Sequence, residues 1–285
     1  MRAIAPAKVN LVLRVGPRRK DGFHELASLI VALDVGDAIE LERAERTTVH
    51  APALPGGDTL VQRALELLVE RSGAQHGFAV ELDKRVPVGA GLGGGSADAG
   101  VALRLANALL ERPVSPEELS AIAAEVGSDV PFFAAGRPAA ELRGRGEAVR
   151  PLRLHAAPVI ALAWPGEPVS TAEVYRAYSS AWSATGFQRA AEGVALAARA
   201  DLPTLAALVA NDLAEPAERL CPASARLCRE LRARGALVAC VSGSGSAVFG
   251  LFAHRETAEQ AVSDLPGAAW TAVSRVLDPA TIQAS

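Results

Sequence analysis

The chain has 285 residues, half of them apolar, with a formal net charge of −3 and an isoelectric point of about 6.0. The apolar content is enough for a sizeable core and excludes a disordered chain, while the acidic balance argues against bulk nucleic-acid binding. The length is generous for one domain and short for two large ones, so we expect two modest lobes that share a cleft.

The cysteines are three in number, an odd count with no CxxC pair: Cys221, Cys228 and Cys240. We therefore expect free thiols in a reducing compartment rather than a disulfide framework or a metal site. The first 15 residues are interrupted by polar side chains and a proline, and no later apolar run is long enough to cross a membrane. These features predict a cytoplasmic protein without a signal peptide or membrane span.

The N-terminal half alternates strand and helix patterns. Strands are expected at residues 2–15, 26–34, 38–43 and 78–82, with a turn at 35–37 between the second and third. Helices are expected at residues 59–72, 96–110 and from 116 onward. Thr59 and Ser115 stand where helix caps are expected, and Gly73 stands where the first helix should stop. Residues 139–150 have short strand character.

The C-terminal half begins with an apolar strand at residues 158–164. Helices follow at 171–182, 187–199, 203–210 and 222–234, and the chain then reads strand, strand, helix, strand at 237–241, 247–252, 256–265 and 270–277. This order predicts an α+β lobe, a sheet with helices on one face. We place the boundary so that residues 1–155 and 156–285 form the two domains.

One loop, PVGAGLGGGSADA at residues 87–99, carries five glycines between Gly89 and Gly95. Glycine loses the most backbone freedom on folding, so five ordered glycines are costly and indicate that the loop has a function. A glycine turn that opens a helix gives phosphate close access to backbone N–H groups. The Walker pattern fails because no lysine follows Gly95, and the Rossmann match is weak because its expected acid, Glu111, ends a helix.

This loop and five other segments resemble the GHMP kinase superfamily. They are PAKVNLVL (6–13), DGFHE (21–25), GSDVPFF (127–133), VSTAEVY (169–175) and SGSGSAVF (242–249). The form GGGSADA is most similar to the members that act on cytidine diphosphate-linked methylerythritol in the methylerythritol phosphate route to isoprenoids. The resemblance implies a two-lobed fold, with a ribosomal-S5-domain-2-like N-terminal lobe, a ferredoxin-like C-terminal lobe and the active site between them.

The resemblance also implies ATP and Mg²⁺, with the γ-phosphate going to the 2-hydroxyl of the cytidine-linked substrate. It implies no nucleic-acid or membrane partner, and we expect a monomer or weak homodimer. The metal ligands stay open. The residues expected to bind ATP are those of the phosphate loop: Pro87, Val88, Gly89, Ala90, Gly91, Leu92, Gly93, Gly94, Gly95, Ser96 and Ala97.

Two residues are the catalytic candidates that the resemblance implies: Asp129 as general base and Lys8 as the cation that orients it and stabilises the alkoxide. On the residues alone, Asp129 could equally cap a turn, and Lys8 could be an edge-strand lysine that reaches solvent. Asn10 lies two residues beyond Lys8, so a strand places both on one face. Its amide could bond either to the substrate or to the catalytic pair.

The substrate side is expected to involve Phe23, His24, Thr171 and Tyr175. By resemblance, Phe23 and Tyr175 flank the cytosine, the main chain of His24 bonds the base, and Thr171 lies near the diphosphate. The alternatives on sequence alone are a packed aromatic, an exposed histidine and a core tyrosine. The family usually has Tyr where Phe23 stands and Asn where Thr59 stands, so the hydrogen bonds of those side chains are in question.

Two more segments stay open. The turn at 242–245 is expected either to pack beside the phosphate loop or to be a plain hairpin turn. Arg143, Arg145 and Arg150 are expected to form a solvated, charged strand pair without a role. The rival functions are another kinase of the superfamily, of homoserine or mevalonate type, and a non-catalytic nucleotide-binding protein. DGFHE and GGGSADA argue against the first, and the presence of both Lys8 and Asp129 argues against the second.

Overall fold

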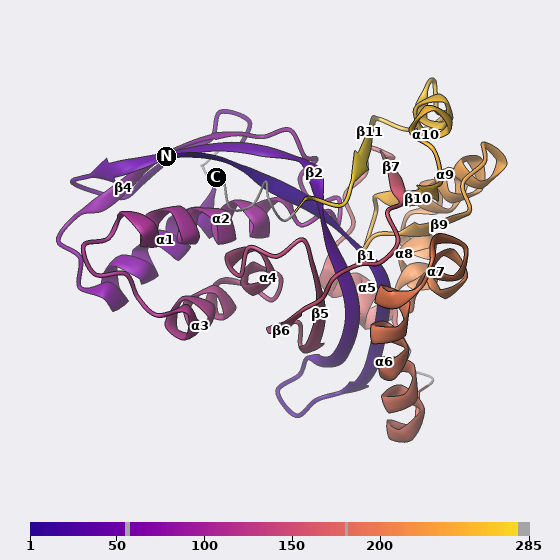
Figure 1. Ribbon diagram of the computed structural model, residues 1–285, viewed down its shortest axis with the longest axis horizontal. Coiled ribbons are helices and arrows are strands. Elements are labelled where there is room, and N and C mark those ends of the chain that lie inside the picture. The colour runs from indigo at the N-terminus through magenta and orange to yellow at the C-terminus, as the bar shows by residue number, and fades with distance from the viewer. Residues whose placement is uncertain (55–57, 180–181, 279–285) are drawn as a thin grey trace.

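The computed structural model describes residues 1–54, 58–179 and 182–278. It has two lobes side by side, one built by the N-terminal half of the chain and one by the C-terminal half (Figure 1). Two long strands run from the first lobe along the boundary with the second. No helix within the described residues has the length and apolar character needed to cross a membrane.

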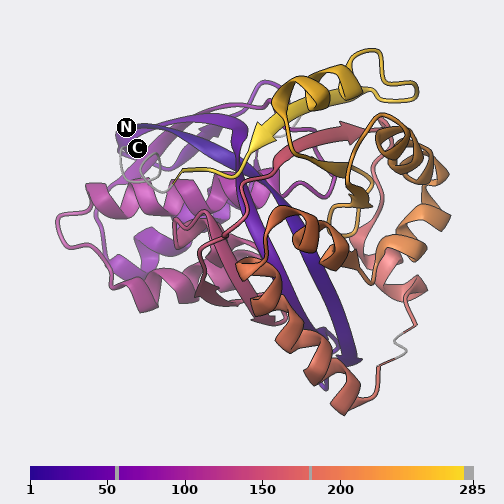
Figure 2. The ribbon, with the colours of Figure 1, turned by 45° about the vertical axis from the view of Figure 1, so that its right-hand side comes forward.

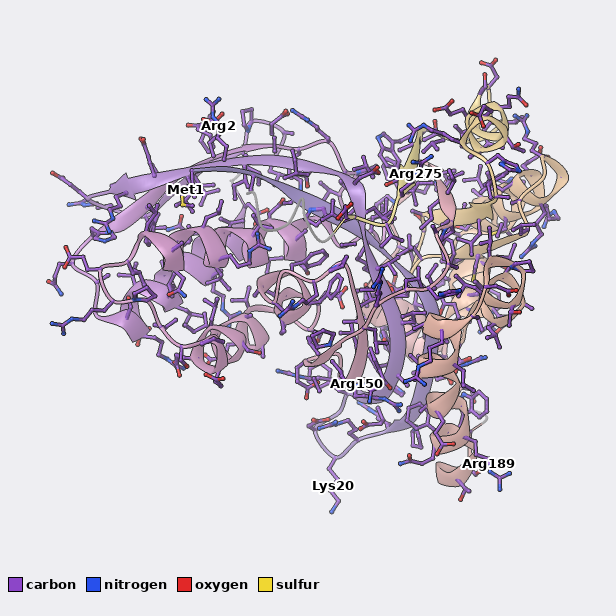
Figure 3. The ribbon with its side chains drawn as sticks, viewed as in Figure 1. Met1, Arg2, Lys20, Arg150, Arg189 and Arg275 are labelled. Carbon is purple, nitrogen blue, oxygen red and sulfur yellow. The ribbon has the colours of Figure 1, made fainter. Side chains whose placement is uncertain are left out.

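The larger sheet has seven strands in the described part of the chain. They are β1 (Arg2–Arg18), β2 (His24–Ala44), β3 (Thr48–His50), β4 (Gly77–Asp83), β5 (Ala139–Gly144), β6 (Ala148–Pro151) and β8 (Ala210–Asn211). The central order is β3-β4-β2-β1-β8, and β5 and β6 extend the sheet from β2. Strands β1 and β2 pair antiparallel from Arg2 with Glu40 to Arg18 with His24. Lys20 projects from the outer tip of their hairpin (Figure 3).

The predicted turn at 35–37 is wrong, because β2 continues through it as one strand. Gly36 lies opposite Pro6, and a Cβ there would stand 2.2 Å from the carbonyl oxygen of Ala5. Glycine therefore lets two backbones approach where a side chain would separate them. The strand pairs with β5 before this point and with β4 after it, so one strand serves both ends of the sheet.

Four helices cover one face of this sheet (Figure 2): α1 (Thr59–Ser72), α2 (Gly94–Leu109), α3 (Pro116–Val126) and α4 (Val130–Ala134). The cap of α1 is Asp58, whose carboxylate accepts from the amides of Leu60 and Val61, and not Thr59 as predicted. Gly73 ends α1 in the left-handed region, and Ser115 caps α3, both as predicted. Helix α2 starts two residues earlier than predicted, and the short α4 was not predicted.

The second lobe is built on a four-stranded antiparallel sheet in the order β11-β7-β10-β9. Its strands are β7 (Val159–Trp164), β9 (Val238–Val241), β10 (Val248–Phe252) and β11 (Trp270–Arg275). Its helices are α5 (Thr171–Ala177), α6 (Ala184–Arg199), α7 (Leu202–Leu208), α8 (Ala214–Leu220), α9 (Pro222–Ala233) and α10 (Arg255–Val262). The strand–strand–helix–strand ending is confirmed, α5 is shorter than predicted, and α8 and β8 were not predicted.

The lobes share a hydrophobic core. One cluster of buried residues joins Val9 and Leu29 of the long strands to Leu162 of β7 and Phe249 of β10. This packing fixes how the lobes face each other, so the residues on their facing surfaces have defined positions. The expected two-lobed α+β architecture is confirmed by these elements.

Candidate active site

A cavity of about 910 Å³ opens between the lobes, large enough for a ligand of drug size or more. It draws residues from distant parts of the chain. Those that matter below are Lys8, Asn10, Phe23, His24, Gly91, Gly93, Ser96, Asp129, Arg145, Thr171, Tyr175 and Ser244. We call this cavity the cleft.

One end of the cleft is the start of α2. Gly93 caps this helix with φ 74° and has no side chain to bond the first amides, and the first helical hydrogen bond runs from Ala97 N to Gly93 O at 2.8 Å. The amides of Gly94, Gly95 and Ser96 therefore lack partners within the helix. With the positive end of the helix dipole they form an anion site.

Glycine is required at two positions of this loop. Gly91 has φ 82° and Gly93 has φ 74°, a region that residues with a Cβ rarely adopt. A Cβ on Gly91 would lie 2.5 Å from the carbonyl oxygen of Ser242, and one on Gly93 would lie 2.8 Å from Cγ of Lys8. The loop thus lies directly against both a second turn and the lysine.

The turn at 242–245 packs beside the phosphate loop, one of the two outcomes left open by the sequence. The hydroxyl of Ser242 donates to the carbonyl of Gly91 at 3.1 Å, and the amide of Ala247 donates to the carbonyl of Ala90 at 2.8 Å. Ser244 faces the cleft. Segments from both lobes therefore make this wall together.

Only part of the predicted ATP loop lines the cleft: Gly91, Gly93 and Ser96. Val88 is exposed outside it, with 59% of its surface free. Three side chains point into the cores beneath the loop: Ala90, Leu92 and Ala97. These apolar residues anchor the loop, and the glycines and the serine present its surface.

Lys8 is buried in β1, so the alternative of an edge lysine reaching solvent is wrong. Its Nζ donates to Oδ1 of Asn10 at 2.7 Å and lies 3.6 Å from a carboxylate oxygen of Asp129. Its own backbone amide donates to the carbonyl of Leu92 at 2.9 Å, which ties the strand to the phosphate loop. The ammonium is therefore held in the wall of the cleft, between Asn10 and Asp129.

Asp129 stands at the N-terminus of α4, but its side chain makes no cap hydrogen bond. The alternative of a local turn cap is therefore wrong. One third of its side chain is exposed, and it lines the cleft beside Ser128. A carboxylate that is open to the cleft and paired with a buried lysine is suited to accept a proton from a bound hydroxyl.

Asn10 shares a face with Lys8, as the strand period predicts. Its Nδ2 donates to Oγ of Ser28 at 2.8 Å, and that hydroxyl donates to the carbonyl of Val12 at 2.8 Å. This chain fixes the amide with its oxygen toward the lysine. Of the two partners considered for Asn10, the structure shows the bond to Lys8, and a bond to the substrate stays a prediction.

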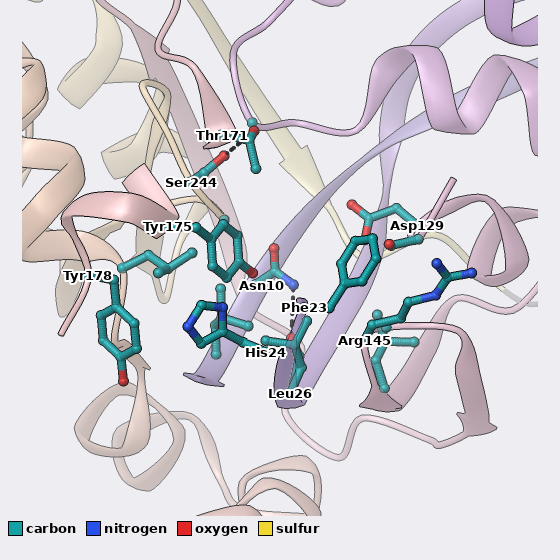
Figure 4. A pocket seen from close by; sticks show the side chains of 18 of the residues that line it. Asn10, Phe23, His24, Leu26, Asp129, Arg145, Thr171, Tyr175, Tyr178 and Ser244 are labelled. Atoms are coloured by element: carbon teal, nitrogen blue, oxygen red, sulfur yellow. Dashed lines mark hydrogen bonds between the residues drawn. The ribbon is translucent and has the colours of Figure 1, made fainter. Parts of the chain in front are cut away.

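The other end of the cleft is aromatic (Figure 4). Phe23 is 47% exposed, and Figure 4 shows its ring on the opposite side of the pocket from Tyr175. The ring of Tyr175 lies at 31° to that of His24 with centroids 5.4 Å apart, and Tyr175 both lines the cleft and packs against the core of the second lobe. Two separated aromatic faces can receive a planar ring between them.

Burial controls the charge states at this end. Burial, with the neighbouring charge of Arg18, holds the pKa of His24 below its ordinary value, so the imidazole is neutral at pH 7. Burial also raises the pKa of Tyr175, and the negative charge of Asp129 adds to this. The aromatic end therefore offers uncharged hydrogen-bonding groups.

Thr171, the first residue of α5, bonds through its hydroxyl to that of Ser244 at 2.8 Å. Both line the cleft between its two ends. A contact of Thr171 with the substrate diphosphate stays a prediction.

Arg143 on β5 and Arg150 on the neighbouring strand β6 form the predicted charged strand pair, with 36% and 64% of their side chains exposed. Arg143 and Arg150 both pair with Glu141, a carboxylate that is almost completely buried. Arg145 lies over the ring of Phe23, 5.1 Å from its centroid, and lines the cleft. Sequence spacing gave no sign of this, because the position of the β5–β6 hairpin depends on its pairing with β2.

A buried ion cluster beneath the phosphate loop was also missed. Nζ of Lys84 lies 2.5 Å from a carboxylate oxygen of Asp37 and 2.5 Å from one of Asp98. Asp37 also accepts from the amide of Val86 at 2.8 Å. A Cβ on Gly94 would stand 3.3 Å from both Lys84 Nζ and Asp37 Oδ2, so the cluster supports the start of α2. The scarcity of lysine, three in the chain, was a signal.

Asp98 is the least satisfied member of this cluster. Its Oδ1 is buried without a hydrogen-bond partner among the residues that the structure describes. Burial, with the nearby charge of Asp37, raises its pKa to about 8 although Lys84 works in the opposite direction. Its proton state is therefore sensitive near neutral pH.

Metal ligands are not preassembled: within residues 1–54, 58–179 and 182–278 no three His, Cys, Asp or Glu side chains form a group that could hold a metal.

The three cysteines are free thiols. Burial raises the pKa of Cys228 to about 12 and that of Cys240 to about 11, so these two are not reactive thiolates.

Comparisons with known proteins agree with this geometry. Residues 59–137 match the family described as GHMP kinases N terminal domain, and residues 194–271 match GHMP kinases C terminal. The chain is 42% identical to the 4-diphosphocytidyl-2-C-methyl-D-erythritol kinase of Anaeromyxobacter sp. (strain Fw109-5), over 92% of this chain and 85% of that protein.

Two solved structures extend the comparison. A crystal structure of 4-(cytidine 5'-diphospho)-2C-methyl-D-erythritol kinase matches with a TM-score of 0.78 and 36% identity, covering 96% of this chain and 98% of that one. The homoserine kinase of Cytophaga hutchinsonii matches with a TM-score of 0.69 at 19% identity, covering 97% and 94%. The second match is evidence of a shared fold alone.

Proposed function

The chain belongs to the GHMP kinases, and from this premise we propose that it transfers the γ-phosphoryl group of ATP to the 2-hydroxyl of 4-diphosphocytidyl-2-C-methyl-D-erythritol. The product is the 2-phosphate, an intermediate of the methylerythritol phosphate route to isoprenoids. The observation that carries the proposal is the Lys8–Asp129 pair, 3.6 Å apart in a cleft between an anion site and an aromatic pocket.

The phosphate end holds ATP. Amides at the start of α2 bind oxygens of the triphosphate, and the bare backbone at Gly91 and Gly93 allows close approach. The hydroxyl of Ser96 adds one more donor at the helix start. Phosphoryl transfer depends mainly on position and charge neutralisation, which this end supplies.

The centre carries out proton transfer. The carboxylate of Asp129 accepts the proton of the 2-hydroxyl as the oxygen bonds to the γ-phosphorus and ADP leaves. The ammonium of Lys8 stabilises the negative charge on the attacking oxygen and on the transferred group. Asn10 holds the lysine in place through its 2.7 Å hydrogen bond.

The aromatic end recognises the cytidine. The base lies between Phe23 and Tyr175, bonded to the main chain of His24, and Thr171 contacts the diphosphate. Arg145 lies over the outer side of the Phe23 ring and adds positive charge near the substrate diphosphate.

Mg²⁺ fits this site only when phosphate oxygens supply most of its ligands, because the described side chains form no metal cage. Magnesium is commonly held in this way, with one or two protein ligands. Ser96, at the start of α2, is the oxygen-bearing side chain that would hold it beside the phosphates. When bound, it neutralises charge on the phosphates.

Other properties follow from the same proposal. We propose that residues 1–155 and 156–285 form the two domains. The support is that residue 155 lies between β6, of the first sheet, and β7, of the second. A cytoplasmic location suits an enzyme that uses ATP and has free thiols. We propose a monomer or a weak homodimer.

The experiment is an assay of ADP release with purified protein and three acceptors: the cytidine-linked methylerythritol, homoserine and mevalonate. Turnover with the first alone supports the proposal. Turnover only with an acceptor that lacks cytidine would favour another kinase of the superfamily. Tight ATP binding without transfer to any acceptor would favour a non-catalytic nucleotide-binding protein.

A further inference from the structure

A second cavity of about 450 Å³ lies in the N-terminal lobe and shares no lining residue with the cleft. It is bounded by the start of β1, residues 32–40 of β2, α2, α4 with residues 136–137 after it, and Leu277 beyond β11. Its volume falls within the range of small-molecule sites, about 300–1,000 Å³. Nothing in the proposed reaction uses it.

The walls of this cavity are mostly apolar. They include Ile4, Pro6, Ile39, Val101, Phe133 and Leu277. Ile4 is 46% exposed although it is a large aliphatic residue, so its side of the cavity is open to solvent, whereas Ile39 and Phe133 lie beneath with at most 3% of their surface exposed. An apolar group placed here would remove hydrophobic surface from water.

The charged residues of the cavity are three arginines and one glutamate. Arg2 pairs with Glu40 at 2.9 Å, and Figure 3 shows Arg2 at the outer edge of the lobe. The side chains of Arg104, on α2, and Arg137, just after α4, form no hydrogen bond or ion pair with any part of the chain that the structure describes. The cavity therefore has an uncompensated positive charge.

Arg104 is the more informative of the two. It lies on α2 one turn beyond Val101, half-buried against the apolar wall. Burial lowers the pKa of its guanidinium, because water is removed and no carboxylate replaces it. An unpaired, partly desolvated cation is costly, and an anion bound beside it would remove that cost.

We propose that this cavity binds a small amphiphilic anion. Its carboxylate or phosphate head pairs with Arg104 and Arg137, and its apolar body lies against Ile4, Ile39 and Phe133. The Arg fork suits either head, because both offer two oxygens to parallel N–H donors. The proposal is independent of which alcohol the kinase phosphorylates.

The cavity is one aromatic ring away from the phosphate loop. Phe133 lines the cavity, and its Cζ lies 3.3 Å from the position that a Cβ on Gly93 would take. A ligand in the cavity thus contacts the same ring that supports the cap of α2.

The test is calorimetric titration of the full chain with octyl phosphate and with octanoate, in the presence of saturating ADP and cytidine diphosphate to fill the cleft. Binding of either probe is expected. Inorganic phosphate, which lacks the apolar body, and octanol, which lacks the anionic head, should each bind at least tenfold more weakly. The variant Arg104→Gln should weaken the amphiphilic probe at least tenfold.

Arg112→Gln is the matched control, since Arg112 is exposed just beyond α2 and outside the cavity. It should bind the probe as the wild type does. A thermal melt checks that Arg104→Gln is folded, which we expect because the change removes an unpaired charge. Ile4→Glu, at an exposed position, provides a second route, because its carboxylate should repel the probe.

Several results would overturn the proposal. They are no binding of either probe, equal binding by Arg104→Gln, equally tight binding of inorganic phosphate, or displacement of the probe by the two nucleotides. The proposal would also be overturned if the probe bound to a chain that ends at Asp278 but not to the full chain, because residues 279–285 would then prevent binding.

Discussion

The ammonium of Lys8 lies 3.6 Å from the carboxylate of Asp129 although the two residues come from opposite ends of the N-terminal lobe's sequence. Lys8 is buried in the long strand β1, and Asp129 stands exposed to the cleft at the start of α4. One partner is held rigidly and the other is open to a substrate. The predictions below test what this pair and its surroundings do.

Asp129→Asn should lower kcat by about 10²–10⁴, the usual contribution of a general base, with little change in the KM for ATP. Because the carboxylate makes no cap hydrogen bond, the variant should melt within a few degrees of the wild type. The checks are an ADP-release assay and a thermal melt. Ser128→Ala, next to it in the cleft, is the control and should keep most of the turnover. Near-normal turnover by Asp129→Asn would remove the base assignment.

Asn10→Ala should reduce kcat by about tenfold, because an aligned hydrogen bond to a charged group is worth about 1.5–3 kcal/mol. The bond runs from Lys8 Nζ at 2.7 Å. In a Lys8→Met background the same change should have little further effect on kcat, since its partner is gone. Steady-state kinetics of the two single variants and the double variant measure this. Additive losses would mean that Asn10 acts independently of Lys8.

Gly91→Ala should destabilise the protein by more than about 1–2 kcal/mol, the cost of the left-handed conformation alone, and raise the KM for ATP. The added Cβ would also meet the carbonyl oxygen of Ser242 at 2.5 Å. Gly193→Ala is the matched control. Gly193 lies within α6, and a Cβ added to it would meet nothing within 4 Å, so alanine there should stabilise by about 0.5–1 kcal/mol. Chemical denaturation measures the free energy of unfolding of both variants, which should fall for Gly91→Ala and rise for Gly193→Ala.

Phe23→Ala should raise the KM for the cytidine substrate by about tenfold, since a stacked aromatic contributes about 0.5–1.5 kcal/mol beyond its buried area. The KM for ATP should not change, because Phe23 lies at the other end of the cleft from Gly93. Phe23 is 47% exposed, so the fold should tolerate the change. Phe23→Tyr, which keeps the ring, is the control. Equal effects on both substrates would place Phe23 outside the cytosine site.

Asp98→Asn should change the pH dependence of stability. The pKa of Asp98 is raised from 3.8 to about 8, so between these values the folded state binds the proton more tightly than the unfolded state. Stability is therefore lost as pH rises through this window, by at most about 1.4 kcal/mol per pH unit. Asparagine cannot titrate, so the Tm of the variant relative to wild type should increase from pH 5 to pH 8.

Thermal melts at several pH values measure this difference. Asp83→Asn, an exposed carboxylate at the end of β4, is the control for removing a surface charge. A Tm difference between Asp98→Asn and wild type that stays constant from pH 5 to pH 8 would contradict the raised pKa of the buried Asp98 carboxyl.

Local pattern was enough to predict most elements of the fold. The alternation of β1, the apolar period of α1 and the serine before α3 are properties of adjacent residues, and the structure contains all three. The local pattern gave a wrong prediction at residues 35–37, where Gly36 and its neighbours favour a turn but the strand pairs through them. There Pro6 of β1 lies opposite and β2 stays continuous, because long-range hydrogen bonds outweigh a local preference.

The candidate site divides in the same way. The glycine loop and the Lys8–Asn10 spacing could be read from the chain because strand and helix periods fix which side chains share a face. Arg145 could not, because it reaches Phe23 only through the pairing of β5 with β2. The cluster of Lys84, Asp37 and Asp98 likewise joins three segments that no local spacing connects.

The sequence by itself determined the chemistry available to this protein: a loop that can hold phosphate, a carboxylate and a lysine to move a proton, and aromatic rings for a base. These depend on residue type and short spacing, which are local. Only the tertiary structure decided that Asp129 faces the cleft instead of capping its helix and that Lys8 is buried beside it. Those outcomes depend on how sheets and helices pack, since burial and distance between remote residues are properties of the folded chain alone.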